Sequence, residues 1–501
     1  MFFDLNKSPP PEGQQDYDVC IAGGGVAGIT LAIKLAARGR RIALLEGGGF
    51  EFTEESQEVY EGPILGRPYF DLDTARLRFL GGTSNHWAGW CRPLDIHDFE
   101  KRLYIPHSGW PIAKVELDEY LEMASQILEI KPDFVDREVE NSDNILNQIE
   151  FHFSPPVLFQ DKYSEELKNS KRIDVFLNSN LVNIVLDGVT GQVSSLECVN
   201  YSNTAIRHTF TARAFVLALG GIENPRLLLN CRDQVSTGIG NSRDLVGRYF
   251  MEHFHAHVAI YGGNKKIWPF SEERVHLSPT SAFMDGQQIA NAGMRLISVD
   301  PDDSPSTLTW AKHHAKRALC TNDIIRDFVQ SIHNFRCPTE MPSFDIAGYL
   351  RVASEQVPNS ASRVLLAEQT DRFGLRRAAL DWQTTNVDRR TIKVMTTAVG
   401  RYLASHGYGN IKLEKWLLDD DLPIPGVGED AWLGAGFHHM GTTRMATTPE
   451  EGVVDPNCRV FGVDNLYIAG SSVFPTGGHA NPTLTIVQLT LRLCDYLDQT
   501  L

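Results

Sequence analysis

The stretch "YDVCIAGGGVAGITLAIKLAARGRRIALLEGGG", residues 17–49, decides the fold class of this chain. Its first six residues, 17–22, form a short β-branched and apolar run that predicts a buried strand. Glycines at 23, 25 and 28 follow in a G-x-G-x-x-G pattern, and an apolar helical pattern comes directly after them. Strand, tight turn and helix in this order are typical of a doubly wound α/β sheet.

A second strand and an acidic residue complete the pattern. Residues 41–45 read as a strand that ends on Glu46, eighteen residues after Gly28. Gly23 permits the tight turn, Gly25 lets backbone N–H groups approach a pyrophosphate, and Gly28 allows helix and strand to pack closely. Glu46 can accept hydrogen bonds from ribose hydroxyls. A plain glycine turn is the alternative, but the whole arrangement favours a dinucleotide site.

A later segment indicates which dinucleotide is bound. The sequence "TARAFVLALGGIENPRLLL", residues 211–229, reads as a buried strand that ends at Gly220 and Gly221 and enters a helix. This second landmark resembles flavoproteins. It favours FAD over NAD as the cofactor.

Composition excludes several classes of partner. The chain has 501 residues, 42% of them hydrophobic and 22% charged, and its net charge is −16 with the acids scattered. No basic stripe is present, so we expect no nucleic acid ligand. No apolar run approaches the length of a membrane span, so we expect no membrane segment. A chain this long predicts two domains, or one domain that carries an insertion.

The cysteines and the N-terminus point to the cytoplasm. The eight cysteines lie far apart without a C-x-x-C pair, so reduced thiols are expected. The opening "MFFDLNKSPPPEGQQDYD" lacks the basic patch and apolar core of an export signal. We therefore expect a cytoplasmic protein whose first 14 or so residues are flexible.

Three further segments carry a family resemblance. They are the stretch "RFLGGTSNHWAG" from Arg78, "GRYFMEHFHAH" from Gly247, and the C-terminal run that starts "GFHHMGTTRM" and includes "GGHANPTLT". In order and spacing they resemble the glucose-methanol-choline (GMC) oxidoreductases. Within that family they look most like the pyranose 2-oxidase branch and the bacterial sugar or glycoside oxidases. The resemblance spans residues 17–110, 211–253 and 436–498.

The resemblance implies two catalytic residues. His438 falls where the family keeps its catalytic histidine, and Asn481 falls where it keeps the partner, an Asn or a second His. A neutral imidazole suits removal of the hydroxyl proton, while Asn481 can hold the substrate oxygen. His479 is the alternative second group, and the neighbouring His439 is expected to be a structural donor.

The resemblance also implies how FAD is held. In the pyranose oxidase branch a Ser-Thr-His-Trp stretch attaches FAD covalently through its histidine, and residues 84–87 here look similar. Asn85 replaces the Thr, and Ala88 replaces a hydroxyl residue, so His86 is expected beside the flavin with the covalent link left open. The FAD-binding residues are then Gly23, Gly25, Gly28, Glu46, Gly82, Ser84, Asn85, His86, Val182, Gly220, Gly470 and Thr483, where Val182 contacts adenine through its backbone.

Other candidate sites are interpreted as structural. His253 and His255 alternate as on a strand beside Glu252, but no third ligand lies at a useful spacing, so no metal is expected. His313 and His314 read as part of an amphipathic or exposed helix. Cys91 reads as a packed thiol.

The domain prediction follows from these landmarks. We expect an α/β, Rossmann-like FAD-binding domain built from residues 1–100, 170–255 and 430–501, and an α+β substrate-binding domain with a large sheet from residues 101–169 and 256–429. Apolar residues at 392, 395, 399 and 403 predict a helix that stops at Gly407. The polar, proline-broken segment 300–314 is a candidate lid.

The expected function is FAD-dependent oxidation of an alcohol to a carbonyl, at a secondary ring hydroxyl of a sugar or glycoside. Alternatives are another alcohol, such as a primary alcohol or an aminocyclitol intermediate, a non-redox lyase on the same scaffold, and a flavin-binding protein without turnover. The expected electron acceptor is oxygen or a quinone-type molecule, and the sequence does not decide between them. No haem or iron–sulfur motif is present in the chain.

Overall fold

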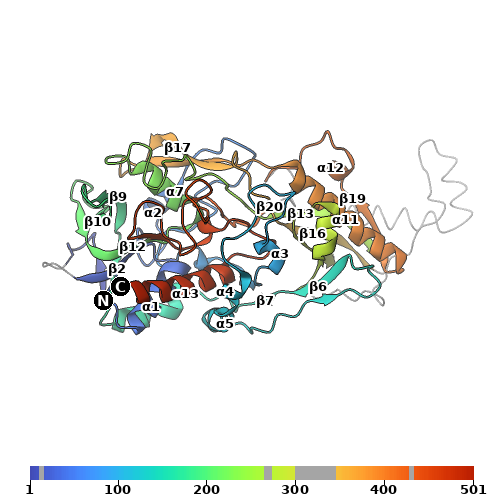
Figure 1. Cartoon of the computed structure of the whole chain (residues 1–501), viewed down its shortest axis with the longest axis horizontal. Helices are drawn as coiled ribbons and strands as arrows, with labels where there is room; N and C mark the ends of the chain where they lie inside the picture. Colours follow the sequence, from blue (N-terminus) through green and yellow to red (C-terminus); the bar gives the residue numbers. More distant parts are fainter. Residues whose placement is uncertain (11–15, 264–272, 299–345, 428–433) are drawn as a thin grey trace, which may run out of the picture.

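The computed structural model describes residues 1–10, 16–263, 273–298, 346–427 and 434–501. Figure 1 shows two large sheets toward opposite ends of the long axis. One sheet is parallel and the other antiparallel. The chain passes from one to the other more than once, so each is assembled from separated stretches of sequence.

The parallel sheet has six strands in the order β1-β8-β3-β2-β12-β21, and all neighbours run parallel. Its two central strands, β3 and β2, are almost entirely buried, as strands covered on both faces by other layers must be. The Rossmann-like α/β class predicted from residues 17–49 is confirmed. The strands are β1 (Phe2–Asp4), β2 (Tyr17–Ala22), β3 (Ile42–Leu45), β8 (Ile173–Leu177), β12 (Ala212–Leu217) and β21 (Leu466–Ile468).

The expectation of a flexible first 14 residues was wrong for the start of the chain. Phe2–Asp4 pairs in parallel with β8 at the sheet edge. Phe3 stacks on Phe176 with ring centroids 5.1 Å apart, so burial of an aromatic ring stabilises this short strand. Residues 11–15 lie outside the described part of the chain.

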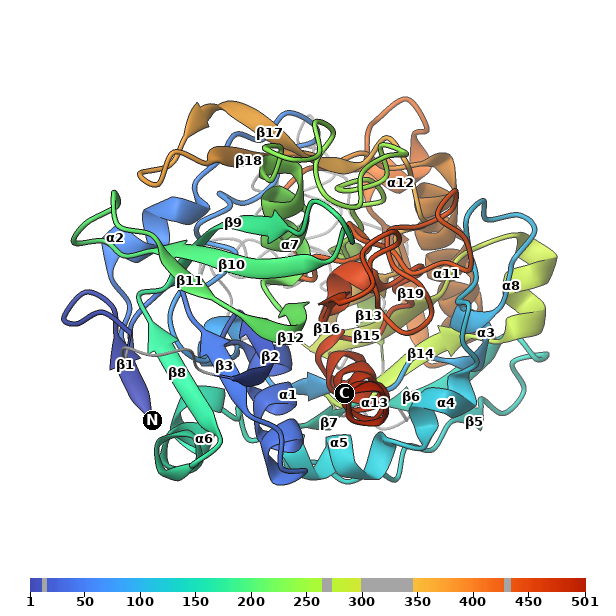
Figure 2. The same cartoon turned by 60° about the vertical axis from the view of Figure 1, so that its left-hand side comes forward.

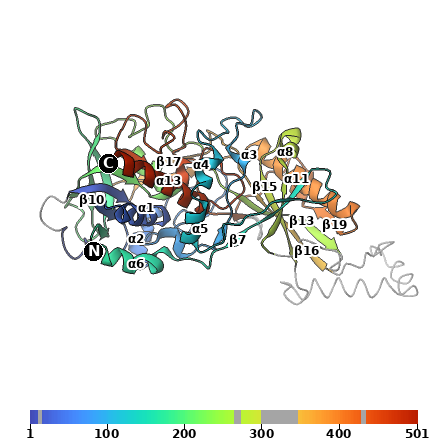
Figure 3. The same ribbon diagram turned by 60° about the horizontal axis from the view of Figure 1, so that its bottom comes forward.

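Helices cover one face of this sheet and a small sheet covers the other. Helices α1 (Val26–Ala37) and α13 (Thr483–Thr500) pack side by side on the first of these faces (Figure 3). Figure 2 shows α7 (Gly220–Asn230) on the opposite side, together with a three-stranded antiparallel sheet of β9 (Asn180–Leu186), β10 (Val193–Val199) and β11 (His208–Phe210). Gly28 brings α1 against the turn, because a Cβ there would overlap the carbonyl oxygen of Gly23.

The second sheet is antiparallel in all its pairings, in the order β19-β13-β16-β15-β14-β6-β5, with β20 also on β13. Helix α11 (Asn386–Ser405) packs against it. The helix predicted from the apolar spacing is thus confirmed, and residues 392, 395, 399 and 403 are buried. The strands are β5 (Arg137–Glu138), β6 (Leu146–Glu150), β13 (Phe254–Gly263), β14 (Val275–Pro279), β15 (Ala292–Ser298), β16 (Ile346–Ser354), β19 (Gly409–Leu413) and β20 (Gly434–Ala435).

One hairpin departs from the predicted domain division. β17 (Arg363–Thr370) and β18 (Arg376–Asp381) fall within 256–429, yet they pack on α7 at the FAD-binding end (Figures 1 and 2). A buried ion pair holds them there, since Arg226 of α7 lies 2.6 Å from Asp371 in the hairpin turn. Ion pairs between residues so far apart in the chain cannot be predicted from local sequence patterns.

Short elements complete the chain. No helix in the described ranges is both long enough and apolar enough to cross a bilayer. His313, His314 and the candidate lid at 300–314 lie outside the described residues. The remaining elements are α2 (Glu54–Gln57), α3 (Ile96–Phe99), α4 (Lys114–Asp118), α5 (Leu121–Leu128), α6 (Phe159–Asn169), α8 (Ser281–Gln287), α12 (Lys415–Leu418), β4 (Trp90–Cys91) and β7 (His152–Phe153), with 3₁₀ turns at Glu58–Tyr60, Gly82–Asn85 and Ser471–Val473.

A buried ion pair fixes the segment after α3 to the end of β16. Arg102 donates two hydrogen bonds, of 2.8 and 2.6 Å, to Glu355, and their side chains are 1% and 0% exposed. We expect Glu355→Gln to lower the free energy of unfolding by about 3–5 kcal/mol, because Arg102 keeps its charge without a partner. Urea denaturation measures the loss. Glu450→Gln, which breaks the exposed pair with Arg243, is the control and should cost less than about 1 kcal/mol. Equal losses would contradict this account.

Candidate active site

A cavity of about 510 Å³ opens at the carboxyl ends of the parallel strands. The turns after β2, β3, β12 and β21 line it, as ligand sites in open α/β sheets do. Residues 436–439 and 481–486, from the C-terminal part of the chain, close another side. The cavity therefore gathers the nucleotide-binding motif and both predicted catalytic residues.

Three glycines form a cradle in this cavity. A Cβ at Gly25, Gly220 or Gly470 would meet no atom within 4 Å, so these backbones border open space. Gly23, at φ +111°, lies so close to the carbonyl of Ala218 that any side chain would clash. The N-terminus of α1 begins at this cradle and offers unpaired N–H groups to an anion. This shape and polarity fit the pyrophosphate of FAD.

Glu46 lines the end of the cavity assigned to adenosine. Its two carboxylate oxygens accept hydrogen bonds from the N–H groups of Gly24 and Gly48, both at 2.8 Å. Each oxygen keeps a lone pair that a ribose hydroxyl can use. Arg78, which sequence reasoning missed, also lines the cavity here and donates to Asn180 at 2.8 Å.

Three predicted FAD-binding residues are not among those that line the cavity. Gly28 acts behind it, in the contact between α1 and the turn. Asn85 turns away and donates to the carbonyl of Leu80 at 2.9 Å. Val182 lies just beyond the lining segment 179–181.

The turn Gly82–Asn85 presents His86 to the cavity. Ser84 anchors the turn by donating to the carbonyl of Gly81 at 2.7 Å, and Trp87 donates to the carbonyl of Val157 at 3.1 Å. The His86 ring has no hydrogen-bond partner within the described ranges and is exposed in the cavity. Partial burial lowers its pKa, so the ring is neutral at neutral pH.

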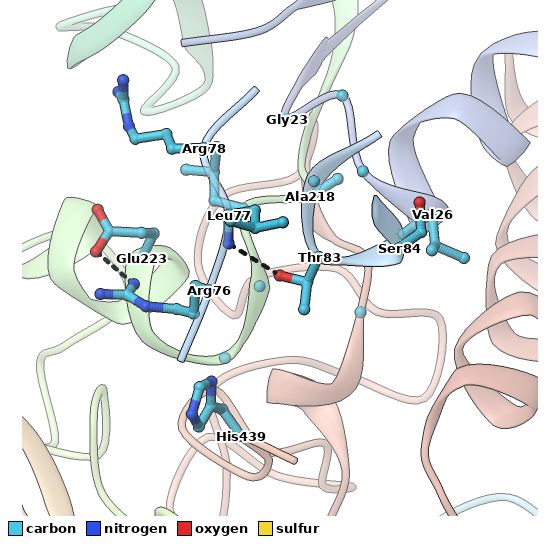
Figure 4. Close-up of a pocket in the computed structure, with 18 of the residues that line it drawn as sticks. Gly23, Val26, Arg76, Leu77, Arg78, Thr83, Ser84, Ala218, Glu223 and His439 are labelled. Atoms are coloured by element: carbon cyan, nitrogen blue, oxygen red, sulfur yellow. Dashed lines mark hydrogen bonds and ion pairs between the residues drawn. The ribbon is translucent and has the colours of Figure 1, made fainter. Parts of the chain in front are cut away.

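Arg76 and Glu223 line the wall above His439 (Figure 4). Arg76 donates to Glu223 at 2.9 Å. Burial alone would raise the pKa of Glu223, but Arg226 and Arg76 outweigh it and lower that pKa to about 2. The group is a fixed carboxylate that neutralises the cations of this wall.

His438 and Asn481 meet at the cavity. Asn481 Nδ2 donates to His438 Nε2 at 3.1 Å, and Thr483, the first residue of α13, lines the same wall. His479 is buried, its Nδ1 lies 3.9 Å from Asp95, and neither of its ring nitrogens has a hydrogen-bond partner among the described residues. The geometry therefore pairs His438 with Asn481 and leaves His479 outside the pair.

His253 fixes the tautomer of His438. The Nδ1 atoms of the two rings are 2.8 Å apart. Because Asn481 donates to His438 Nε2, His438 carries its proton on Nδ1 and donates to His253. The single lone pair of Nε2 accepts the hydrogen bond from Asn481 at the cavity wall. Burial, and secondarily His253, His255 and His439, lower the pKa of His438 well below its usual value.

Glu252 holds the backbone around both histidines. It accepts hydrogen bonds from the N–H groups of His253 at 2.8 Å, His438 at 2.9 Å and Gly436 at 3.2 Å, and from the hydroxyl of Tyr69. Burial raises the pKa of Glu252 to about 7 despite these donors. The Tyr69 hydroxyl also lies 2.9 Å from His439 Nε2, which explains why His439 does not pair with Asn481.

The purely structural interpretation of Glu252, His253 and His255 was therefore incomplete. His253 contacts His438 directly, and the ring of His255 lies 5.9 Å from that of His438. The alternation in "EHFHAH" was the available signal, since it places the histidines on one strand face. Tyr69 gave no signal in the sequence.

Among the residues described, the site has neither a set of metal ligands nor a reactive thiol. No group of three or more His, Cys, Asp or Glu is arranged to hold a metal ion in those ranges. Burial raises the pKa of the Cys91 thiol to about 12, which keeps it protonated and unreactive.

Comparisons with known proteins agree with this geometry. Residues 18–350 match the family described as FAD dependent oxidoreductase, and residues 358–490 match the GMC oxidoreductase family in its C-terminal domain. The chain is 22% identical to 2-methyl-1,2-propanediol dehydrogenase of Mycolicibacterium austroafricanum, over 96% of this chain and 95% of that protein. A 60-residue part is 47% identical to C-glycoside 3-oxidase of Arthrobacter globiformis, covering 12% of each chain.

Solved structures share the fold. Pyridoxine 4-oxidase from Mesorbium loti superposes with a TM-score of 0.57 at 17% identity, over 96% of this chain and 99% of that one. The glycine cradle, the buried Glu46 and the family matches lead to one conclusion. The chain belongs to the FAD-dependent oxidoreductases, and its C-terminal part is a GMC oxidoreductase domain.

Proposed function

We propose that this protein oxidises an alcohol to a carbonyl compound, and that the alcohol is a secondary ring hydroxyl of a sugar or glycoside. The observation that carries the proposal is the His438–Asn481 pair, 3.1 Å apart on the wall of a cavity that fits FAD. The local likeness to a C-glycoside 3-oxidase supports the sugar assignment. When bound, FAD supplies the oxidising power by accepting a hydride from the substrate carbon.

His438 is the proposed general base. Its Nε2 lone pair, which accepts from Asn481 at the cavity wall, takes the hydroxyl proton of the alcohol once the Asn481 amide donates to the substrate oxygen instead. The amide of Asn481 is uncharged, lies beside the same nitrogen and orients the substrate oxygen. His253 accepts a hydrogen bond from the Nδ1–H of His438, and this bond holds the ring in place while Nε2 receives the second proton.

Glu252 stabilises the protonated base. It accepts the backbone N–H of His438 at 2.9 Å, and in its ionised form, which predominates above a pKa of about 7, its charge offsets the imidazolium that forms. His253 shares that charge through the 2.8 Å contact between the two Nδ1 atoms. Both residues act through His438 and are positioning residues.

Another alcohol is the second candidate. The relative matched over almost its full length is named as a diol dehydrogenase, which favours a small aliphatic alcohol. The two candidates share the same base and cofactor and differ only in the substrate side of the cavity.

An anaerobic titration tests the function. The purified holoenzyme is mixed with sugars, glycosides, aliphatic diols and primary alcohols, and bleaching of the flavin absorbance is followed before air or a quinone is admitted. Bleaching by glycosides supports the proposal, and bleaching by diols alone overturns the sugar assignment. Recovery in air identifies an oxidase, whereas recovery only with quinone identifies a dehydrogenase. Holoenzyme that no alcohol bleaches overturns the redox proposal.

We expect His438→Ala to slow flavin reduction by about 10²–10⁴-fold, because the hydroxyl proton loses its acceptor. Stopped-flow absorbance under anaerobic conditions measures the rate. His406→Ala is the control, because that ring packs on Tyr402 beyond the end of α11 and away from the cavity. A rate within threefold of the native rate in His438→Ala would remove His438 from the mechanism.

The pH profile of flavin reduction follows from the lowered pKa of His438. The base must be neutral, so the rate falls as pH drops through its pKa, and the acid limb should lie below 6.5. Burial and the neighbouring His253, His255 and His439 all disfavour its protonation. Rates measured over a pH series locate the limb. A limb near pH 7 that disappears in Glu252→Gln would belong to that carboxyl instead.

His86 is expected to control flavin retention. Its unpartnered ring in the cavity suits either contact with the flavin or attachment to it. We expect His86→Ala to lower the flavin content of the purified protein, measured from absorbance. Acid precipitation separates the two roles, since attached flavin stays in the pellet and contacted flavin enters the supernatant. Unchanged flavin content in His86→Ala would exclude both.

A further inference from the structure

The second sheet turns a polar face toward the FAD-binding end. On β13, Phe254, Ala256 and Val258 belong to the apolar core under the sheet, while His253, His255 and His257 alternate with them on the other face. His253 and His255 lie next to His438, so this second face borders the active site. Its residues are therefore candidates for substrate recognition.

Two arginines stand side by side on this face. Arg295 of β15 and Arg351 of β16 are directly opposite in the antiparallel register. Opposite residues have Cβ atoms about 4.5–5.5 Å apart, and like charges at such positions destabilise a sheet. Both residues sit among apolar neighbours that alternate with them, because Met294, Leu350 and Val352 are buried on the far face. The pair therefore needs an explanation other than packing.

The charges of the pair are only partly balanced. Arg295 lies 3.0 Å from Glu273, whose side chain is 67% exposed, and it stacks over the ring of Trp90 at 4.9 Å. Arg351 donates to the neutral ring of His255 at 3.0 Å. No carboxylate within the described ranges lies at ion-pair distance from Arg351. Among the described residues, the two guanidinium charges thus share one exposed carboxylate, that of Glu273.

Contacts with His255 and Trp90 connect the arginine pair to the region around His438. His255, which accepts from Arg351, has its ring 5.9 Å from the ring of His438. Its Nε2 is buried and has no hydrogen-bond partner in the described part of the chain. Trp90, under Arg295, lines the cavity directly. The pair is therefore linked to the site at two points, through His255 to His438 and through Trp90 to the cavity wall.

We propose that the substrate is an alcohol that carries an anionic group, a carboxylate or a phosphate ester, which Arg351 and Arg295 bind while its hydroxyl lies at His438. This inference rests on the proposed function and names its substrate class. Arginine presents a planar fork of N–H donors that matches both oxyanions, and partial burial strengthens such charge-assisted hydrogen bonds. The anionic group stays unchanged while the hydride and proton leave the carbinol.

The local charge opposes the charge of the whole chain. A net charge of −16 would disfavour an anion at long range, yet salt screens that effect beyond about 8–10 Å. Contact with a desolvated arginine pair is not screened in this way. The same pair disfavours a cationic substrate such as an aminocyclitol.

The test compares matched ligands on the holoenzyme. Methyl glucoside, methyl glucuronoside and glucose 6-phosphate are titrated by calorimetry and used as reductants of the flavin. We expect one or both anionic ligands to bind about 10–100-fold more tightly than the glucoside, the range for a charge-assisted hydrogen bond. Preference for the glucuronoside indicates a carboxylate substrate and preference for the phosphate indicates a phosphate ester. A native enzyme that binds all three equally overturns the proposal.

Two variants link the preference to the pair. Arg351→Gln should reduce the ratio of anionic to neutral affinity at least tenfold, and Arg351→Glu should shift the preference toward methyl glucosaminide, whose amine is cationic. Arg363→Gln, on β17 and paired with Asp244, is the control and should keep the native ratio. An unchanged ratio in both Arg351 variants overturns the proposal. Since binding needs no turnover, these results stand apart from flavin bleaching, which alone decides the proposed function.

Discussion

The backbone contact at Gly23 and Gly28 is the constraint on which the nucleotide-binding end depends. The turn after β2 lies against the carbonyl of Ala218 at the end of β12, and α1 lies against the turn, with no room for a Cβ at either glycine. These contacts bring the N-terminus of α1 and the turns after β2 and β12 to one place. They also position the N–H of Gly24 to donate to Glu46. The close packing of the turn after β2, the end of β12 and α1 therefore determines the geometry of both the phosphate end and the ribose end of the cavity.

The buried carboxyl group of Glu252 is the corresponding constraint around His438. Glu252 gathers N–H groups from residues at the start of β13 and from the segment before His438, which are separated by about 185 positions in the chain. Through them it sets the 2.8 Å contact between His253 and His438. The ring of His438, the proposed base, is therefore oriented by a hydrogen-bond network around β13 and the segment that follows β20.

Local patterns predicted much of the fold and part of the site. The strand, turn and helix from Tyr17 onward, the strand and helix around Gly220, and the helix over residues 392–403 have strong periodicity, and each is present. The three-residue strand at Phe2 was too short to give a period. The contacts of His253 with His438 and of Arg226 with Asp371 join segments that are far apart in the chain. Patterns within a short stretch of sequence therefore could not predict them. The alternating histidines of β13 did show a polar strand face, but not what that face would meet.

The order of the elements along the chain has a consequence for synthesis. Five of the six strands of the parallel sheet, up to β12, are complete by residue 217, whereas the last strand, β21, and the helix that covers α1 come roughly 250 residues later. At about 5–20 residues per second, the ribosome leaves one edge of β12 and the apolar side of α1 uncovered for on the order of 10–50 s. Unpaired edges and apolar faces invite association with other chains. The nascent protein is thus most vulnerable to aggregation in that interval, and His438 and Asn481 emerge only at its end.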